Sequence, residues 1–359
     1  MNTGQYIERS SAWMPSGPES GVAISSRVRL ARNMADAAFP GWAGEEDRIR
    51  VWEQLRDLLP ACPSIKNYQA AGMDELSGLD KQILFERHLI SRELAERSRG
   101  SGVVIRDDEV VAVMINEEDH IRLQCIRPGL DIAAAWKEAD ALDSEIEGSV
   151  DFSFSPQLGY LTACPSNVGT GMRASVMLHV PGLVLTKEIN AVVKGMAKIG
   201  LAVRGLWGEG SEAAGNMFQV SNQMTLGESE EDIVDQLEQI VQEIIEHERN
   251  ARWRVLEADE HRIYDLPGRS YGILAYAHIL RSKEALDLLS DLRLGVDMGI
   301  VDLRNECVIN ELLILSQPGH LQKQEGRKLK ATERDIRRAE LIRERIKASK
   351  NDLDGKEHE

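Results

Sequence analysis

The sequence predicts an α+β protein, in which a largely antiparallel sheet flanked by helices is followed by an all-α helical domain. Several short β-branched runs are joined by tight turns, as residues 102–106 and 110–115 are by Asp107-Asp108-Glu109, and such hairpins build antiparallel sheets. Segments with the periodicity of amphipathic helices separate the other strands, and beyond residue 266 the alternation typical of strands stops. We therefore expect an arm at residues 1–23, an α+β domain at 24–258, a helical domain at 266–350 and a polar tail at 351–359.

Periodicity and turn residues place the individual elements. Strands are expected at residues 22–30, 102–106, 110–115, 120–126, 160–163, 173–180, 201–206 and 217–220. Helices are expected at 45–59, 78–85, 131–146, 186–200 and 229–247, with Thr186 and Ser229 as N-caps and Gly200 at a C-terminus. In the helical domain they are expected at 271–280, 283–294, 308–315 and 333–348. Because so small a bundle has a limited core, we expect it to pack on the other domain or on a second copy, and we favour a homodimer.

Composition excludes several classes of protein. The 359 residues are 42% hydrophobic and 28% charged, without a signal peptide or an apolar run long enough to span a bilayer, so a cytoplasmic protein is expected. Four scattered cysteines without CxxC spacing predict neither disulfides nor a protein metal site. A net charge of −16 argues against direct binding to nucleic acid or an anionic membrane.

The segment with the clearest chemical character is CPSNVGTG at residues 164–171, with Arg173 close behind it. Its small residues let backbone N–H groups approach an anion, and a thiol, Cys164, precedes them. The alternative is an ordinary strand connection, since the same residues fill turns for conformational reasons. Arg27 and Arg29 project to one face of a strand, and two such cations suit an anion, although solvated surface arginines are the commoner case.

A resemblance to a known family favours the functional interpretation. CPSNVGTG closely resembles the CP(S/T)NxGT signature of the phosphagen (guanidino) kinases, whose cysteine sits against the substrate guanidinium. SSRVR at 25–29 resembles the SSRVR of that family, NEEDHIR at 116–122 resembles its NEEDHxR, and Arg204-Gly205 begins the stretch with its last phosphate-binding arginine. The order of the segments is the same, and they span residues 20–255.

The resemblance implies an ATP site built from arginines, which suit the equatorial oxygens of a transferring phosphoryl group. Mg²⁺ would be held largely by phosphates and water, so no protein metal cage is expected. The segments expected at the nucleotide comprise Ser25, Ser26, Arg27, Val28, Arg29, His88, Arg122, Arg173, Ala174, Ser175, Val176, Met177, Arg204, Gly205, Leu206, Trp207 and Gly208. A lone histidine is more often structural, so His88 is the weakest member of this set.

The acceptor determines which acidic residues are needed. A guanidinium pKa near 13 and a glutamate pKa of about 4.3 differ by roughly 9 units, so complete deprotonation before transfer would cost about 12 kcal/mol. A carboxylate must therefore orient the attacking nitrogen and receive its proton late, and Glu118 is expected in this role with Glu117 beside it. Cys164 as a thiolate would be a second anion, and Glu209 a second acidic clamp.

A closer resemblance is to the bacterial protein-arginine kinases of the McsB type. Small-molecule phosphagen kinases carry a helical domain of about 100 residues before SSRVR and a Gly-Thr-Gly-Gly stretch near Glu209; this chain matches neither, as in the McsB type. Arg334-Asp335-Ile-Arg337-Arg338-Ala339 matches their RDxxRA motif, an allosteric pocket for phosphoarginine. The plainer interpretation is a solvated face with ion pairs such as Glu333–Arg337 and Glu340–Arg343.

The resemblance implies phosphorylation of arginine in proteins, including unfolded proteins and a CtsR-type repressor. It also implies a McsA-type activator and degradation of the marked proteins by ClpC-ClpP. Two alternatives remain: a kinase for a free guanidino compound, and an inactive adaptor that binds phosphoarginine. The retained arginines with Glu117, Glu118 and Cys164 argue against the adaptor.

Overall fold

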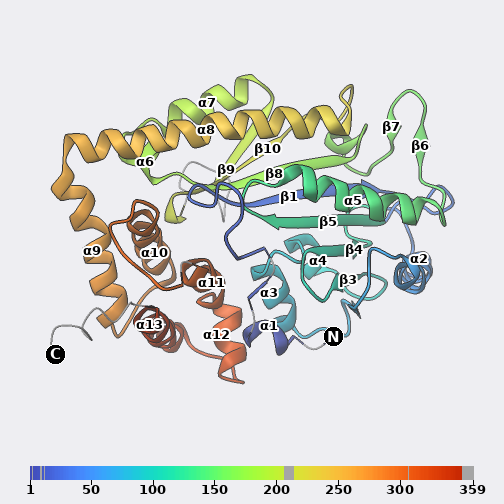
Figure 1. Cartoon of the computed structure of the whole chain (residues 1–359). Coiled ribbons are helices and arrows are strands. Elements are labelled where there is room, and N and C mark those ends of the chain that lie inside the picture. The colour runs from blue at the N-terminus through green and yellow to red at the C-terminus, as the bar shows by residue number, and fades with distance from the viewer. Residues whose placement is uncertain (2, 9, 12, 206–213, 306, 350–359) are drawn as a thin grey trace.

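One large antiparallel sheet forms the centre of the molecule (Figure 1). The computed structural model describes all residues except 2, 9, 12, 206–213, 306 and 350–359. Within the described residues the sheet has eight strands in the order β2-β3-β4-β5-β1-β8-β10-β9, and each neighbouring pair is antiparallel. They are β1 (Ala23–Arg32), β2 (Tyr68–Gly72), β3 (Gly102–Arg106), β4 (Val111–Ile115), β5 (Ile121–Pro128), β8 (Met172–His179), β9 (Leu201–Gly205) and β10 (Met217–Asn222).

Most predicted strands are confirmed, including the β3–β4 hairpin, but one is largely wrong. Of residues 160–163 only Tyr160 is in a strand: a small separate hairpin pairs β6 (Phe154–Ser155) with β7 (Gly159–Tyr160). The chain leaves strand geometry there because the backbone N–H of Ala163 donates to the Asp119 carboxylate, 2.7 Å away, instead of to a neighbouring strand. β2 was not predicted.

Two long helices cover one face of the sheet (Figure 1). They are α5 (Ile132–Glu147) and α8 (Glu230–Ala258), and they pack on the fully buried Val28, Leu123 and Val176. Ser229 caps α8, with Asp232 completing the predicted capping box, and the helix continues past residue 247. Because this face buries alternate residues of each strand, the intervening residues face the other side, where the site lies.

The prediction that Thr186 begins a helix is wrong. Thr186 ends a short helix, α6 (Pro181–Leu185), and its hydroxyl donates to the Gly182 carbonyl one turn back, 3.0 Å away. The next helix, α7 (Ile189–Lys198), starts after Glu188. A threonine hydroxyl can bond backward as readily as it can cap forward, and Pro181 had already opened a helix. Gly200 has the expected positive φ, 78°.

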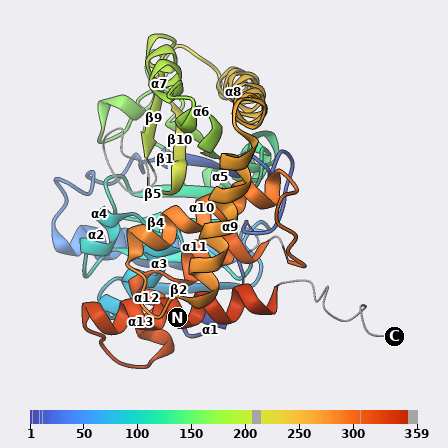
Figure 2. The same cartoon turned by 90° about the vertical axis from the view of Figure 1, so that its left-hand side faces the viewer.

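The opposite face is covered in two parts. Over β3 and β4 lie α3 (Gly78–Glu86) and α4 (Arg92–Glu96). Helix α2 (Glu45–Leu58), which ends in the one-turn η1 (Leu59–Ala61), instead belongs to the core on the α5–α8 face. Against β8 and β10 lie the carboxy-terminal helices, which Figure 2 shows below α7 and α8. They are α9 (Glu260–Tyr276), α10 (Ser282–Asp297), α11 (Cys307–Leu315), α12 (Pro318–Gln324) and α13 (Ala331–Ala348). The predicted fold class is confirmed.

The helical region differs from expectation in two places. Helix α12 was not predicted, and α9 begins at Glu260 and continues through Pro267, where a break was expected. Proline is accommodated because Gly295 of α10 leaves room for it: a Cβ on Gly295 would lie 2.4 Å from the Pro267 Cβ. None of the described helices is both long and apolar enough to cross a membrane.

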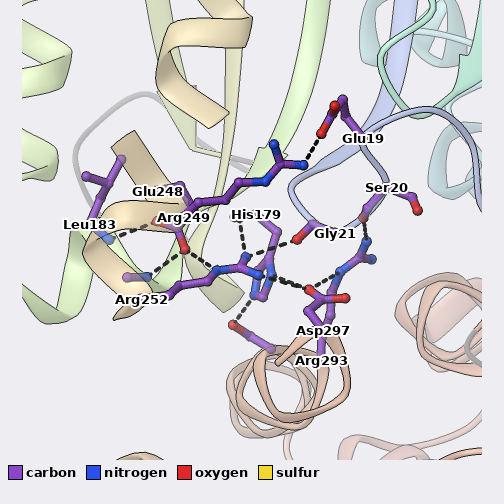
Figure 3. A network of polar contacts seen from close by, with 12 residues as sticks. Glu19, Ser20, Gly21, His179, Leu183, Glu248, Arg249, Arg252, Arg293 and Asp297 are labelled. Carbon is purple, nitrogen blue, oxygen red and sulfur yellow. Dashed lines mark hydrogen bonds and ion pairs between the residues drawn. The ribbon is translucent and has the colours of Figure 1, made fainter. Parts of the chain in front are cut away.

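The helical region shares its core with the sheet, as the small size of the bundle led us to expect, since Ile24 and Met217 belong to its apolar cluster. A buried charge network reinforces this junction (Figure 3). Arg252 of α8 donates to Glu248 at 2.7 Å and lies 3.5 Å from Asp297 of α10. Arg293 of α10 donates to the Ser20 carbonyl at 2.6 Å, so the amino-terminal segment is joined to the helical region.

The amino-terminal segment packs against both the sheet and the helical region. It contains α1 (Gln5–Glu8), and its Tyr6, Trp13 and Met14 are all buried. The Met14 carbonyl accepts a hydrogen bond from Asn310 of α11 at 2.9 Å. This segment therefore brings Trp13 to the cavity described below, between the sheet and the helical region.

Candidate active site

Arginine side chains from four strands gather on the uncovered part of the sheet. In the antiparallel ladder Arg29 of β1 lies opposite Arg173 of β8, and Ala31 lies opposite Arg122 of β5. Arg27 precedes Arg29 by two residues in β1 and therefore lies on the same face of the sheet. Register therefore collects these side chains, with Arg204 of β9, into one group: Arg27, Arg29, Arg122, Arg173 and Arg204.

These arginines repel one another across the site. Burial, Arg173 and Arg122 lower the pKa of Arg27 to about 10, so it stays charged near pH 7. Burial also lowers the pKa of Arg29 well below its usual value, and Arg27, Arg122 and Arg173 add to this shift. Among the described residues, none is a hydrogen-bond partner of the buried Nε atoms of Arg29 and Arg173. Unpartnered donors in a cluster of like charge fit a polyanion such as the tail of a nucleoside triphosphate.

A cavity of about 630 Å³ adjoins this group. Residues of the predicted nucleotide site that line it are Ser25, Arg27, His88, Ser175, Met177, Arg204 and Gly205. Residues that the motifs did not indicate also line it, among them Trp13, Phe85, Arg92, Gln219 and Asn310. Burial and Arg27 lower the pKa of His88 to about 4, so the ring is neutral at pH 7. The lining combines apolar side chains such as Trp13 and Phe85 with the cationic Arg27 and Arg204, a combination that fits a base and its phosphates.

Four predicted nucleotide residues face away from this cavity. Val28, Ala174 and Val176 belong to the core on the α5–α8 side, and Ser26 donates to the Gly129 carbonyl there, 2.8 Å away. Their side chains therefore do not belong to the site, because strand alternation places them on the opposite face. Leu206, Trp207, Gly208 and Glu209 lie outside the described residues.

The two glutamates of the turn between β4 and β5 have different surroundings. Glu117 is fully buried, accepts from Ser91, and holds Arg122 with N–O distances of 2.8 and 2.6 Å. Glu118 is 45% exposed and meets Arg122 with one oxygen at 3.1 Å. Glu117 thus positions Arg122, whereas Glu118 is accessible to an incoming group.

A buried hydrogen-bond cluster joins this turn to the Cys164 loop. One oxygen of Asp119 accepts from Asn33 Nδ2 at 2.6 Å and from the Ala163 N–H at 2.7 Å. Asn33 Oδ1 accepts from the His120 N–H at 2.9 Å. Burial, Arg204 and Arg122 lower the pKa of Arg173, and the nearby Cys164 partly opposes this shift. The cluster fixes the spacing between Glu118 and Cys164, which belong to two motifs and are more than forty positions apart in the sequence.

The glycines after Cys164 are required by close backbone contacts. Gly169 has φ 118°, and a Cβ there would lie 2.0 Å from the Thr225 carbonyl oxygen. Gly171 has φ 64°, and a Cβ there would lie 2.6 Å from the Ala31 carbonyl oxygen of β1. The loop is thereby pressed against β1 and the segment after β10.

Asn33 was not indicated by any motif, and its geometry predicts a positioning role. We expect Asn33→Ala to lower kcat about tenfold or more while the KM for ATP changes little, because it releases the Glu118 turn from the Cys164 loop and leaves the arginines in place. Steady-state kinetics test this, and thermal unfolding reports separately on folding. A higher KM for ATP with unchanged kcat would contradict the role.

The five residues predicted to form the site at the carboxy-terminal RDxxRA motif are divided between surface and interior. Arg338 and Ala339 are buried, and Arg338 donates to the carbonyls of Ser316 and Leu280 at 2.9 and 2.8 Å. Asp335 accepts from Arg338 at 2.6 Å. Arg337 lines a shallow hollow with Ile336 and lies 2.9 Å from Glu325 and 3.3 Å from Glu340. Arg334 donates to the Leu329 carbonyl at 3.4 Å.

The expected pairing of Glu333 with Arg337 and of Glu340 with Arg343 is wrong. Glu333 pairs with Arg327 at 2.9 Å, and Arg343 donates to the Ala277 carbonyl. Residues outside α13 supply the partners of Glu333 and Arg343, whereas Glu340 pairs within the helix with Arg337 instead of with Arg343.

The comparisons with known proteins agree with this geometry. Residues 50–251 match the family model described as ATP:guanido phosphotransferase, C-terminal catalytic domain. Lombricine kinase has the same fold, with a TM-score of 0.57 and 22% identity over 68% of this chain and 70% of that one. The duplicated taurocyamine kinase from Schistosoma mansoni gives 0.59 and 22%, over 91% and 50%. The fold and the site define the class, a phosphotransferase of the ATP:guanido type.

The remaining matches define the family more narrowly. Residues 260–357 match the model described as Protein-arginine kinase McsB C-terminal domain. The protein-arginine kinase of Geobacillus sp. (strain WCH70) is 48% identical over 94% of each chain, and that of Bacillus subtilis (strain 168) is 46% identical over 95% of this chain and 94% of that one. The chain belongs to the protein-arginine kinase family.

Proposed function

We propose that this protein transfers the γ-phosphoryl group of ATP to the guanidino group of arginine residues in proteins. The observation that carries the proposal is a cluster of mutually repelling arginines, two of whose buried Nε atoms have no partner among the described residues. Glu118, which pairs with Arg122, and Cys164 lie beside this cluster. The family supports a protein acceptor, because the curated relatives are named protein-arginine kinases.

The residues divide the work of transfer between nucleotide and acceptor. Arg27, Arg29 and Arg173 bind the triphosphate and neutralise charge that develops on the moving phosphoryl group. Glu118 orients the attacking nitrogen and takes its proton, and Cys164 holds a second nitrogen. Mg²⁺ that enters with ATP would neutralise part of the phosphate charge, and the proposal assigns it no protein ligand. Glu209 remains a proposed second acidic clamp.

We further propose that residues 24–258 carry catalysis and residues 266–350 carry regulation and dimerisation. Helix α9 supports a dimer: the exposed Tyr264 and Tyr276 lie in line with Gly268 and Gly272, and no described residue comes near the position of a Cβ at either glycine. The proposed cytoplasmic partners are a McsA-type activator, a CtsR-type repressor and unfolded proteins as substrates, and ClpC-ClpP as the protease that receives them. Phosphoarginine would bind at the carboxy-terminal motif.

The structure divides that motif into an accessible and a structural arginine. We expect Arg337→Ala to weaken activation by phosphoarginine while basal kcat changes less than about twofold, since Arg337 lies at an open hollow. Arg338→Ala should instead cost about 3–5 kcal/mol of folding stability, because it leaves buried carbonyls and Asp335 without their partner. Thermal unfolding and rates with and without phosphoarginine distinguish the two variants. If the Arg337→Ala and Arg338→Ala proteins unfold at the same temperature, the assignment of Arg338 as the structural arginine is contradicted.

The acceptor class is tested with γ-labelled ATP and two acceptors, an unfolded basic protein and free arginine or creatine. The proposal predicts acid-labile label on the protein. Label on the free guanidino compound alone would support a small-molecule kinase, and no transfer to either acceptor would support a binding adaptor.

A further inference from the structure

Four large apolar side chains are exposed beside the Cys164 loop. We name them the apolar collar: Phe154 (57% exposed), Leu158 (46%), Met224 (55%) and Leu226 (50%). Large apolar side chains that are exposed beside a functional loop indicate a place where another molecule binds.

The collar is joined to the Cys164 loop by backbone contacts. Tyr160 of the β6–β7 hairpin exchanges hydrogen bonds with Gly169, at 2.8 and 3.3 Å. On the other side, the Thr225 carbonyl accepts from Thr170 at 2.8 Å, and the Thr225 hydroxyl donates to Val168 at 2.7 Å. Thr225 is buried against the loop, so Met224 and Leu226 on either side of it face outward. The hairpin lies at one end of the sheet, where α8 begins (Figure 1).

We infer that the collar binds the polypeptide around the acceptor arginine and selects arginines that have large apolar neighbours in an unfolded chain. This inference rests on the proposed function. The occupant follows from position and charge. The collar residues lie on the two segments that contact the Cys164 loop, and acidic side chains lie near the hairpin: Glu230, Glu231 and Asp232 form the first turn of α8. Burial raises the pKa of Tyr160, and Glu230 is among the carboxylates that add to this shift. An apolar surface with an acidic border suits a basic, apolar segment, which a folded protein buries and an unfolded one exposes.

The test uses two peptides of equal length and charge with one central arginine, flanked by leucines in one and by serines in the other. The full-length protein should phosphorylate the leucine peptide with a kcat/KM about tenfold higher, since burying one apolar side chain is worth this much or more. Phe154→Ser with Leu226→Ser should remove that preference and leave the kcat/KM for the serine peptide within about twofold. Thermal unfolding verifies that the variant is folded.

The matched control is Trp253→Ser, an exposed apolar residue near the other end of α8, roughly 35 Å away along the helix. It should keep the leucine preference. Phosphoarginine on both peptides without preference, or an equal loss on both in the variant, overturns the collar alone. A changed molecular mass with an unchanged peptide ratio would show that the collar joins copies of the chain, which also overturns it. No phosphoarginine on either peptide overturns the proposed function itself.

Discussion

Replacement of Glu118 by glutamine is expected to lower kcat for arginine phosphorylation by about 10³-fold, within the 10²–10⁴ typical of a lost general base. The amide has the size of the carboxylate but cannot take the proton that the attacking nitrogen must lose. It also lacks the charge that orients the guanidinium. Because Glu118 is exposed and meets Arg122 with a single oxygen at 3.1 Å, its replacement should leave the arginines in place.

The measurement is the rate of phosphoarginine formation under saturating ATP, with affinity for a non-hydrolysable ATP analogue measured in parallel. Affinity should change less than about threefold. Glu246→Gln, an exposed carboxylate on α8, is the control and should keep full activity. A Glu118→Gln variant that retains more than about a tenth of the rate would remove Glu118 from the role of base.

Replacement of Arg29 by methionine is expected to have opposite effects on stability and on ATP binding. Burial lowers the pKa of Arg29, and so do the neighbouring Arg27, Arg122 and Arg173. Its positive charge therefore opposes folding while no nucleotide is bound. Removing it should raise the free energy of unfolding of the ligand-free protein by about 1 kcal/mol. It should also weaken ATP binding about 100-fold, because a charge-assisted contact worth about 2–3 kcal/mol is lost.

Thermal unfolding with and without ATP, together with calorimetric titration, gives both values. Arg127→Met is the matched control, since Arg127 also lies on the sheet but has a carboxylate partner, Glu138, at 2.6 Å. It should show no gain in stability and no loss of ATP affinity. A destabilised Arg29→Met protein that binds ATP normally would mean that Arg29 is a structural residue.

The sequence predicted best what depends on local period. Alternation on one strand was enough to place Arg27 and Arg29 on one face, and it was equally sufficient to show that Val28 lies on the other. Helical period also carried an unused signal. Arg338 lies on the apolar side of α13, with Leu341 and Ile342 three and four residues on, so its burial could have been predicted.

Other features depend on tertiary contacts that leave no periodic signal. Asn33 is a single residue after a strand, and its importance depends on Asp119 and His120, which are distant in the sequence. Trp13 belongs to a segment without periodicity and reaches the cavity because α11 holds the adjoining Met14. The apolar collar is likewise assembled from two segments distant in the sequence, which contact the Cys164 loop through Tyr160 and through Thr225.

The central claim is that arginines hold the nucleotide while Glu118 and Cys164 direct an arginine of another protein to its terminal phosphorus. Mass spectrometry of an unfolded, casein-like protein after incubation with the enzyme and ATP, kept under non-acidic conditions, tests it most directly. The account predicts fragments that localise the phosphoryl group to arginine residues, and their absence with the Glu118→Gln variant. Phosphate on serine, threonine or tyrosine instead, or on arginine at the same level with Glu118→Gln, would contradict it.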